Sequence, residues 1–286
     1  MADPGVRAAC ELVVVGPSGT GVDVDERTGG WSRGGSAAAG GQASALAIER
    51  AVALAMNGSV QGIVTAPIDK AALLAAGYDY PGHTEMLAAL TGSRVAMMLA
   101  SETLRVVLAT THIALRDVPR LVTESTIVDA AAITRRYLDA WFGIPSPRIA
   151  LCALNPHAGD GGRFGDEDAT VLAPAARLAR IAGPFPADTV FVRALRGEFD
   201  AVIAPYHDVG MTAIKVASFG SAVNVTLGLP FPRTSPDHGT ALDIAGRGIA
   251  DPGSFIIATL LCARIASRIA GHIAGGVDAS ASVHTH

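Results

Sequence analysis

The chain has 286 residues, of which 50% are hydrophobic, 17% are charged and only 5% are aromatic. This length suits two domains that share a cleft, and the composition is that of a well-buried globular protein. The formal net charge is −4, and no long run of basic residues occurs. Charge and composition therefore argue against a protein that binds nucleic acid or a membrane surface.

The N-terminus, from Met1 to Val15, lacks a positive region followed by a long apolar core, so it does not predict a signal peptide. The longest apolar run, residues 255–263, is about half of a membrane span. The three cysteines lie far apart in apolar stretches, which favours reduced thiols. We therefore expect a cytoplasmic protein.

Residues 17–43 are rich in Gly, Ser and Ala, and they predict a loop or a disordered stretch. The apolar residues of segment 44–56 recur at helical spacing, with Ser44 as a candidate N-cap and Asn57-Gly58 as a stop signal. A helix is therefore predicted over this segment.

Beyond it, short apolar runs alternate with helical stretches. The runs predict strands over residues 62–66, 106–110, 149–154, 201–204 and 222–227. The predicted helices include residues 125–141, 167–181 and 254–270. This alternation is typical of an α/β protein whose mostly parallel sheet is covered by helices.

Three of the predicted strands are followed by a histidine: His112 in VVLATTH, His157 in IALCALNPH and His207 in AVIAPYH. In open α/β sheets ligands gather beyond the carboxyl ends of the strands, so the three imidazoles could converge. Such a site with an open position suits a catalytic Zn²⁺, with Co²⁺ or Mg²⁺ as alternatives. The spacings match no short metal motif, and each histidine alone could be an ordinary structural residue.

A second set of residues predicts an anion pocket. In PGHTE, His83 and Thr84 open a helical stretch, and a helix N-terminus with hydroxyl and imidazole donors suits a phosphate or a carboxylate. Thr84 is a candidate N-cap. Near the strand at 222–227, Lys215 offers a point charge, Arg233 a planar fork and Asn224 an amide. The alternative is an ordinary helix cap with surface charges.

Two further patterns stand out. Of the 22 basic residues only Lys70 and Lys215 are lysines, which reflects either chance or a need for a compact charge at those two places. The glycine-punctuated stretch at residues 237–246 contains Asp243, which could accept hydrogen bonds from ribose hydroxyls and would repel the additional phosphate of NADP. The glycines at residues 16–21 have the wrong order for a Rossmann fingerprint.

The segments VTAPIDK, YPGHTE, ATTHIALRDV, LNPHAGDGGRFGDE, PYHDVG and NVTLGLPFPRTSPDHGTALDIAGRG follow one another between about residue 46 and about residue 265. Together they resemble the 4-hydroxythreonine-4-phosphate dehydrogenase family of vitamin B6 biosynthesis. The resemblance implies a fold like that of isocitrate and isopropylmalate dehydrogenases, with two α/β domains around a cleft. Residues 1–76 with 241–286 would form the cofactor-side domain, and residues 77–240 the metal, substrate and dimerisation domain.

The resemblance also assigns residues. His112, His157 and His207 match the metal ligands of the family, one of them supplied by the partner chain of a homodimer with a shared active site. The substrate-binding positions are matched by His83, Thr84, Lys215, Asn224 and Arg233. The stretch HGTALDIAGRGIADP is similar to the adenosine-binding loop of isopropylmalate dehydrogenases, which implies a cofactor site that favours NAD and consists of His238, Gly239, Thr240 and Asp243.

The implied reaction is NAD-linked oxidation of the C3 hydroxyl of 4-phosphohydroxy-L-threonine, followed by loss of CO₂, which yields 3-amino-2-oxopropyl phosphate. A metal chelated by the hydroxyl and amino groups makes the hydroxyl more acidic, and the phosphate anchors the far end of the substrate. Lys215 is expected to accept the proton or to stabilise charge, and Asp208 to orient an imidazole.

Three alternatives stay open. A paralogue would oxidise 4-phospho-D-threonate or 4-phospho-D-erythronate, because one side chain could decide between an amino group and a hydroxyl at C2. A metal-dependent hydrolase or lyase would use the three histidines without NAD. A catalytically silent remnant is the third, because family members usually open with a GDPxGIGPE-type segment that this chain does not show, and we therefore expect a truncated N-terminal domain.

Overall fold

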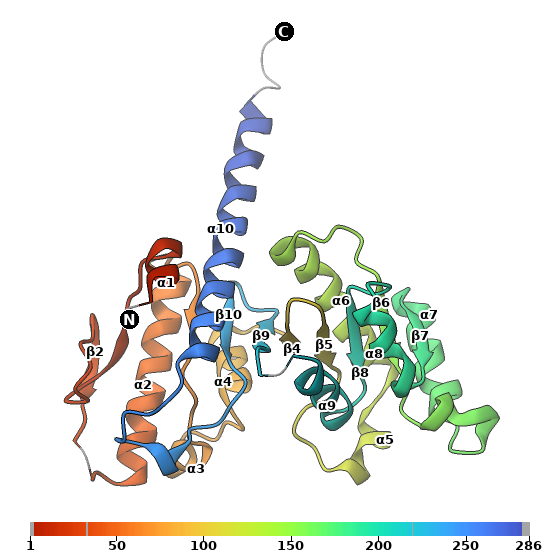
Figure 1. Ribbon diagram of the computed structural model, residues 1–286, viewed down its shortest axis with the longest axis horizontal. Coiled ribbons are helices and arrows are strands. Elements are labelled where there is room, and N and C mark those ends of the chain that lie inside the picture. The colour runs from red at the N-terminus through yellow and green to blue at the C-terminus, as the bar shows by residue number, and fades with distance from the viewer. Residues whose placement is uncertain (1–2, 33, 219, 282–286) are drawn as a thin grey trace. The chain divides into compact units, whose positions relative to one another are not determined.

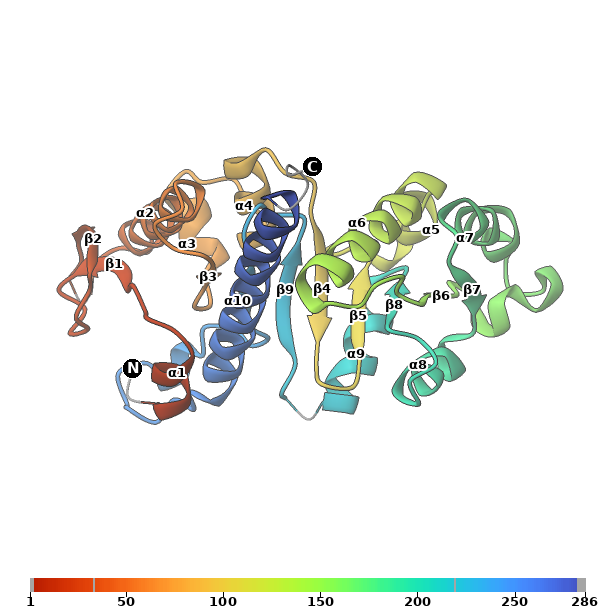
Figure 2. The ribbon, with the colours of Figure 1, turned by 90° about the horizontal axis from the view of Figure 1, so that it is seen from above.

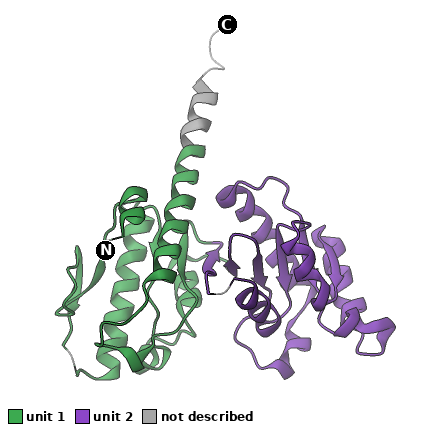
Figure 3. Cartoon of the chain, viewed as in Figure 1, with its two compact units in different colours: residues 1–95, 229–286 green, residues 96–228 purple. Residues whose placement is uncertain are grey.

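The computed structural model describes residues 3–32, 34–218 and 220–281, with side chains described as far as residue 272. The chain forms two compact units (Figure 3), of which unit 1 comprises residues 1–95 and 229–286 and unit 2 comprises residues 96–228. The division expected from the sequence had boundaries after residues 76 and 240. Segments 77–95 and 229–240 belong to unit 1 in the structure.

Unit 1 contains several helices around short strands (Figure 1). Its elements in chain order are α1 (Pro4–Ala9), β1 (Val15–Ser18), β2 (Glu26–Gly30), α2 (Ala37–Met56), β3 (Ile63–Val64), α3 (Lys70–Ala75), α4 (His83–Thr91), β10 (Arg233–Pro236), η4 (Leu242–Ile244) and α10 (Gly253–Ala281). The parallel pair β3 and β10 lies beside a core to which α2, α3 and α4 contribute apolar side chains.

The loop predicted over residues 17–43 is found between β1 and β2 and before α2, but the rest of this stretch forms strands and a helix. β1 and β2 pair in parallel within this stretch, and α2 begins at Ala37, where the side chain of Ser36 accepts the N–H of Ala39 at 3.2 Å. Ser44, the candidate N-cap, lies inside the helix, and its hydroxyl donates to the carbonyl of Gly40. Glycine weakens a helix only by a fraction of a kcal/mol to about 1 kcal/mol, so packing against α3 can override the local composition.

Gly41→Ala is expected to destabilise the protein by about 3 kcal/mol or more, because a Cβ at Gly41 would overlap the carbonyl of Ala72 and lie 2.9 Å from the N of Leu73. Helices α2 and α3 would have to separate. Gly40→Ala is the matched control: no heavy atom lies within 4 Å of the added Cβ, and the helix gains about 0.5–1 kcal/mol. Relative to the unmodified chain, the urea concentration at the midpoint of unfolding should fall in Gly41→Ala and rise in Gly40→Ala. Equal midpoints for the two variants would contradict this packing.

Helix α10 docks on unit 1 with one face. Its residues Ala258, Cys262 and Ile265 are buried, and the hydroxyl of Thr234 in β10 donates to the carbonyl of Ala258 at 2.8 Å. Over Gly253–His272 this helix is long and apolar enough to cross a membrane by length and composition alone, and it exceeds the run expected from the sequence. A single helix of this kind is weak evidence, since core helices of soluble proteins meet the same criterion.

Unit 2 is built on a sheet in the order β9-β4-β5-β8-β6-β7. Its elements in chain order are β4 (Ala96–Ala100), β5 (Arg105–Leu108), η1 (Leu115–Asp117), α5 (Val118–Leu121), α6 (Glu124–Phe142), β6 (Ile149–Cys152), η2 (Pro156–Gly162), η3 (Asp168–Leu172), α7 (Ala173–Ala179), β7 (Ala182–Phe185), α8 (Ala187–Leu195), β8 (Ala201–Ala204), α9 (His207–Ser218) and β9 (Val223–Leu227). Strands β5, β8, β6 and β7 run parallel, and β4 is antiparallel to both of its neighbours.

Helices cover both faces of this sheet (Figure 2): α6 lies on one face, and α8 and α9 lie on the other. On the face of α8 and α9, side chains such as Leu99, Val106 and Ala204 pack with Met211 and Ile214 of α9. The helix predicted at 125–141 is α6, which begins with a capping box between Thr123 and Thr126 and ends at a left-handed glycine. The predicted layered α/β architecture is therefore confirmed.

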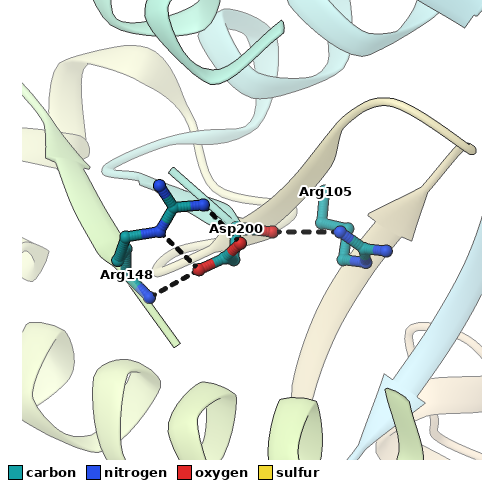
Figure 4. Close-up of polar contacts among 3 residues, drawn as sticks. All are labelled: Arg105, Arg148 and Asp200. Atoms are coloured by element: carbon teal, nitrogen blue, oxygen red, sulfur yellow. Dashed lines mark hydrogen bonds and ion pairs between the residues drawn. The ribbon is translucent and has the colours of Figure 1, made fainter. Parts of the chain in front are cut away.

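The amino ends of three strands are tied together by a polar cluster (Figure 4). The carboxylate of Asp200 accepts from Arg148 Nη2 at 3.0 Å and Nε at 3.1 Å, and Arg105 Nη1 donates to the Asp200 carbonyl at 3.3 Å. Hydrogen bonds from Arg148 hold the pKa of Asp200 below its usual range. Since Arg148 is mostly exposed, the pair adds little stability, and it lies away from the carboxyl edge of the sheet.

Candidate functional site

Three histidines follow the carboxyl ends of adjacent parallel strands. The order β5-β8-β6 places the ends of these strands side by side. His112 follows β5, His207 is the first residue of α9 after β8, and His157 follows β6. The topology thus brings all three segments to one edge of the sheet in unit 2.

Two of the imidazoles are neighbours. The ring centroids of His112 and His207 lie 5.6 Å apart, with the rings tilted by 44°. Two imidazoles on one tetrahedral Zn²⁺, with bonds of about 2.0–2.1 Å, place their centroids about 5 Å apart, so this separation is compatible with a shared ion. His207 Nδ1 lies 2.7 Å from Asp208 Oδ1, which leaves Nε2 for a metal, as in carboxylate–histidine–zinc arrangements.

The position of His207 follows from how α9 packs. Gly210, in the first turn of α9, allows the helix to approach the sheet: a Cβ at Gly210 would lie 2.7 Å from Leu108 Cδ2 and 2.9 Å from the Cβ of Ala204. These two residues end β5 and β8, the strands that precede His112 and His207. Close packing of helix on sheet therefore brings the two rings together.

His157 lies in a turn of unusual conformation, which we call the left-handed turn (residues 157–161). All five residues have positive φ, with values of 53° for His157, 55° for Ala158 and 43° for Asp160. The left-handed region costs a residue other than glycine roughly 1–2 kcal/mol, so the surrounding structure must hold this turn. Strain of this kind is often found at functional sites.

The structure does not bring His157 together with the other two rings. His157 is exposed, and in the part of the chain that the structure describes, no group of three or more His, Cys, Asp or Glu residues is placed to hold a metal. One chain therefore supplies a pair of imidazoles with a carboxylate partner rather than a complete site.

Other expected residues lie around α9. Asp208 and Lys215 are seven residues apart, so they share one face of this helix about two turns from each other. Asn224 pairs with Leu99 across β9 and β4, which places it on the face of the sheet that α9 covers. Its Oδ1 is buried and has no hydrogen bond among the described residues. A buried acceptor of this kind suits a ligand that brings a donor.

In unit 1, Arg233 and His83 form the core of the predicted anion pocket. Arg233 opens β10, is 2% exposed, and donates from Nη2 to Thr65 Oγ1 at 2.5 Å. Burial lowers its pKa to about 10, so it stays charged at neutral pH. Burial, with a smaller effect of the Arg233 charge, lowers the pKa of His83 to about 3. These two predicted site residues therefore combine a cation with a neutral imidazole.

The helix start differs from the expectation. Helix α4 begins at His83, and its N-cap position is Gly82, which forms no side-chain cap. Thr84 lies inside the first turn, so its predicted capping role is wrong, because the chain enters the helix two residues earlier. Without a capping side chain, the first N–H groups of α4 are suited to an anion.

Lys70 is a further residue beside these groups, and its motif did not predict this position. Lys70 is the first residue of α3, and a Cβ at Gly82 would lie 3.7 Å from Lys70 Cε and 3.5 Å from Glu85 Oε2. The ammonium stem therefore lies beside the start of α4. The scarcity of lysines was the available signal, but nothing local in VTAPIDK shows which element Lys70 approaches.

His83 should make the stability of the protein sensitive to acid. Its pKa is about 3 in the fold against 6.5 ordinarily, so below about pH 6.5 the unfolded chain binds a proton that the folded chain refuses. The contribution of neutral His83 to the free energy of unfolding is complete above about pH 6.5. It is lost as the pH falls toward 3, at up to about 1.4 kcal/mol per pH unit. His83→Asn should reduce the loss of unfolding free energy between about pH 6.5 and about pH 4.5. His238→Asn, at an exposed position, is the control, and identical pH profiles for both variants would contradict this reasoning.

The residues expected to bind the cofactor lie on the segment after β10. His238 and Gly239 are exposed, and His238 Nδ1 is 3.0 Å from the Gly239 carbonyl. Asp243 lies in the short helical turn η4 and is also exposed, while Thr240 is half-buried. The carboxylate of Asp243 is thus open to a ligand.

Comparison with known proteins decides the family. The model of the family described as pyridoxal phosphate biosynthetic protein PdxA matches residues 12–262. The chain belongs to the PdxA family. This confirms the family expected from the motifs.

Named PdxA relatives support this assignment. A 4-hydroxythreonine-4-phosphate dehydrogenase of Beijerinckia indica subsp. indica is 52% identical over 223 residues, which cover 76% of this chain and 66% of that protein. One from Xanthomonas campestris pv. campestris strain B100 is 48% identical over 217 residues, covering 74% and 67%. The crystal structure of the Klebsiella pneumoniae enzyme aligns with a TM-score of 0.73 at 45% identity, over 79% of this chain and 71% of that one. The chain spans about two thirds of the length of these curated relatives.

Proposed function

We propose that this chain oxidises 4-phosphohydroxy-L-threonine with NAD in a metal-dependent reaction that ends in decarboxylation and yields 3-amino-2-oxopropyl phosphate. The observation that carries the proposal is the match to PdxA-family relatives named 4-hydroxythreonine-4-phosphate dehydrogenase, at 48–52% identity. The buried guanidinium of Arg233 with the neutral imidazole of His83 in unit 1, and the paired imidazoles in unit 2, support it. We further propose a cytoplasmic homodimer, in keeping with the metabolic role of the family.

The proposed phosphate site consists of residues of unit 1. Arg233 stays charged at neutral pH and can present its planar fork to phosphate oxygens. Neutral His83 can donate one hydrogen bond without adding a second buried charge. Thr84, in the first turn of α4, contributes a hydroxyl, and Lys70 adds a point charge at the rim. This remote binding would hold the reacting carbon in place.

The residues in unit 2 fit a divalent ion. His112 and His207 would be ligands from one chain, and His157 is proposed as the ligand from the partner subunit of a shared site. A bound Zn²⁺, or Co²⁺ or Mg²⁺ in its place, would polarise the substrate hydroxyl oxygen and the developing ketone. Asp208 fixes the orientation of the His207 ring through Nδ1.

Proton handling is assigned to α9. Lys215, two turns beyond Asp208 on the same helix face, is proposed to receive the hydroxyl proton or to stabilise the charge left on oxygen. Asn224 would accept a hydrogen bond from the substrate through its buried Oδ1. NAD would take up the hydride and would be bound by His238, Gly239, Thr240 and Asp243, where the Asp243 carboxylate favours NAD over NADP.

The test is an NADH-formation assay with the zinc-loaded chain. The expected result is turnover of 4-phosphohydroxy-L-threonine with NAD, little turnover with NADP, and loss of activity on chelation that returns with Zn²⁺. Turnover of 4-phospho-D-threonate or 4-phospho-D-erythronate in its place would shift the assignment to a sugar-acid enzyme. Metal and phosphate binding without NADH formation from any of the three would overturn the dehydrogenase proposal.

A further inference from the structure

The left-handed turn is attached to the sheet by a buried carboxylate. Asp168 is 2% exposed and begins η3, the π-helical turn that precedes α7. Its Oδ1 accepts the N–H of Leu154 at 2.8 Å, and its Oδ2 accepts the N–H of Asn155 at 2.9 Å. These two residues connect the end of β6 with the turn. A single side chain thus fixes the direction in which the chain leaves the strand.

A second group of contacts closes the turn from the other side. The side-chain amide of Asn155 donates to Glu167 Oε2 at 2.8 Å. A Cβ at Gly159 would lie 2.9 Å from the carbonyl oxygen of Gly165, and a Cβ at Gly165 would lie 3.0 Å from the Asn155 side-chain nitrogen. Gly159 therefore packs against the backbone of Gly165, and the Asn155 and Glu167 side chains leave no room for a Cβ at Gly165.

We infer that Asp168 is a positioning residue that sets the place of the His157 imidazole. The inference rests on the proposed function, in which His157 is a metal ligand. His157 comes two residues after Asn155, so any tilt of the Asn155 peptide displaces the ring. A metal ligand tolerates little displacement, because its affinity depends on how its supporting contacts orient it.

The bonding of Asp168 explains how it can hold a strained turn. Hydrogen bonds from backbone N–H groups to an ionised carboxylate are stronger than those to a neutral acceptor. Removing the acceptor leaves two donors in a part-buried place without a replacement, which is costly. The left-handed residues then lose the contact that compensates their strain, and the turn can relax toward ordinary backbone angles. The imidazole would move with it.

The experiment measures the Zn²⁺ affinity of the full chain by competition with a chromophoric chelator, expressed per folded molecule. Asp168→Asn is expected to weaken binding about 10–100-fold, the range seen when supporting partners of metal ligands are removed. Glu167→Gln weakens the hydrogen bond between the Asn155 side chain and residue 167, and it is expected to weaken Zn²⁺ binding several-fold. Asp166→Asn is the matched control, because Asp166 is exposed and its neighbours bond to its backbone carbonyl.

Hydrogen exchange separates loss of the anchor from general unfolding. The amides of Leu154 and Asn155 should exchange faster in Asp168→Asn, while the Arg148 amide, which Asp200 holds at the opposite edge of the sheet, should not change. If Asp168→Asn does not fold, Glu167→Gln decides the matter with the same two readouts. Affinity equal to that of Asp166→Asn, or exchange that rises equally at Arg148, would overturn the inference.

His157→Ala distinguishes the inference from the function beneath it. If His157→Ala binds Zn²⁺ as tightly as the unmodified chain, His157 is not a ligand. The proposed ligand role of His157 and the positioning role of Asp168 would then both be wrong. Loss of affinity in His157→Ala with full affinity in both Asp168→Asn and Glu167→Gln would leave the metal site standing and overturn the positioning role alone.

Discussion

Replacing His207 with alanine is expected to lower kcat by about three orders of magnitude or more, because the variant loses both a proposed metal ligand and the charge stabilisation that the metal supplies. The fold should survive. His207 is the first residue of α9 and its side chain is 34% exposed, so the melting temperature should stay within about 3 °C. NADH formation and thermal unfolding of the same preparation check both parts.

Two further variants test the same metal site, one with a smaller expected effect and one as a control. Asp208→Asn keeps the size of the side chain that holds His207 Nδ1 and should cost about 10–100-fold in metal affinity. His272→Ala removes an exposed imidazole on α10, where it bonds to the carbonyl of Arg268, and should leave activity unchanged. Equal activity of His207→Ala and His272→Ala would contradict the proposed metal site.

Replacing Arg233 with lysine is expected to raise KM for the phosphorylated substrate about 10–100-fold and to change kcat much less. Arg233 is 2% exposed and reaches Thr65 Oγ1 through Nη2. Lysine retains a charge but cannot form the planar fork, and a hydrogen bond to a charged group contributes about 1.5–3 kcal/mol. Initial-rate kinetics over a range of substrate concentrations separate KM from kcat.

The control for this variant is Arg264→Lys, at an exposed position of α10, for which no kinetic change is expected. Inorganic phosphate should compete with substrate in the unmodified chain and less in Arg233→Lys. A normal KM for Arg233→Lys would show that the buried guanidinium supports the fold without touching the phosphate, and the anion pocket would have to be placed elsewhere.

Sequence patterns located the strands that position the site. The runs predicted at 106–110, 149–154, 201–204 and 222–227 correspond to β5, β6, β8 and β9. Their alternation with helices was enough to predict that His112, His157 and His207 follow the carboxyl ends of strands. The physical reason is that buried parallel strands are continuous apolar runs bounded by turn residues, which is a strong local signal.

Other elements depended on contacts that composition does not reveal. Strand β4, a short apolar run with two methionines, is buried on both faces and antiparallel to its neighbours, and periodicity cannot distinguish such a run from a buried helix segment. Only the end of the glycine-rich stretch belongs to α2, where Gly41 packs against α3. The predicted helix at 167–181 corresponds to η3, a π-helical turn, and to α7, which follows it directly and ends at Ala179 with Arg180 in the left-handed conformation.

In the candidate site too, some features could be predicted from the sequence and others depend on packing. Motif order identified the residue types, but the pairing of His112 with His207, the neutral state of His83 and the approach of Lys70 to α4 all arise from packing. The anchoring of the left-handed turn by Asp168 spans a loop between the two bonded segments. Contacts of this kind depend on how separate elements meet, which a single sequence does not specify.

X-ray absorption spectroscopy at the zinc edge, on the full chain loaded with one Zn²⁺ per subunit, tests the metal site most directly. We expect three imidazole nitrogens at about 2.0–2.1 Å, completed by oxygen, with one imidazole lost in each of the alanine variants of His112, His157 and His207. A spectrum with a single imidazole or with sulfur ligands, unchanged by those three substitutions, would contradict the account.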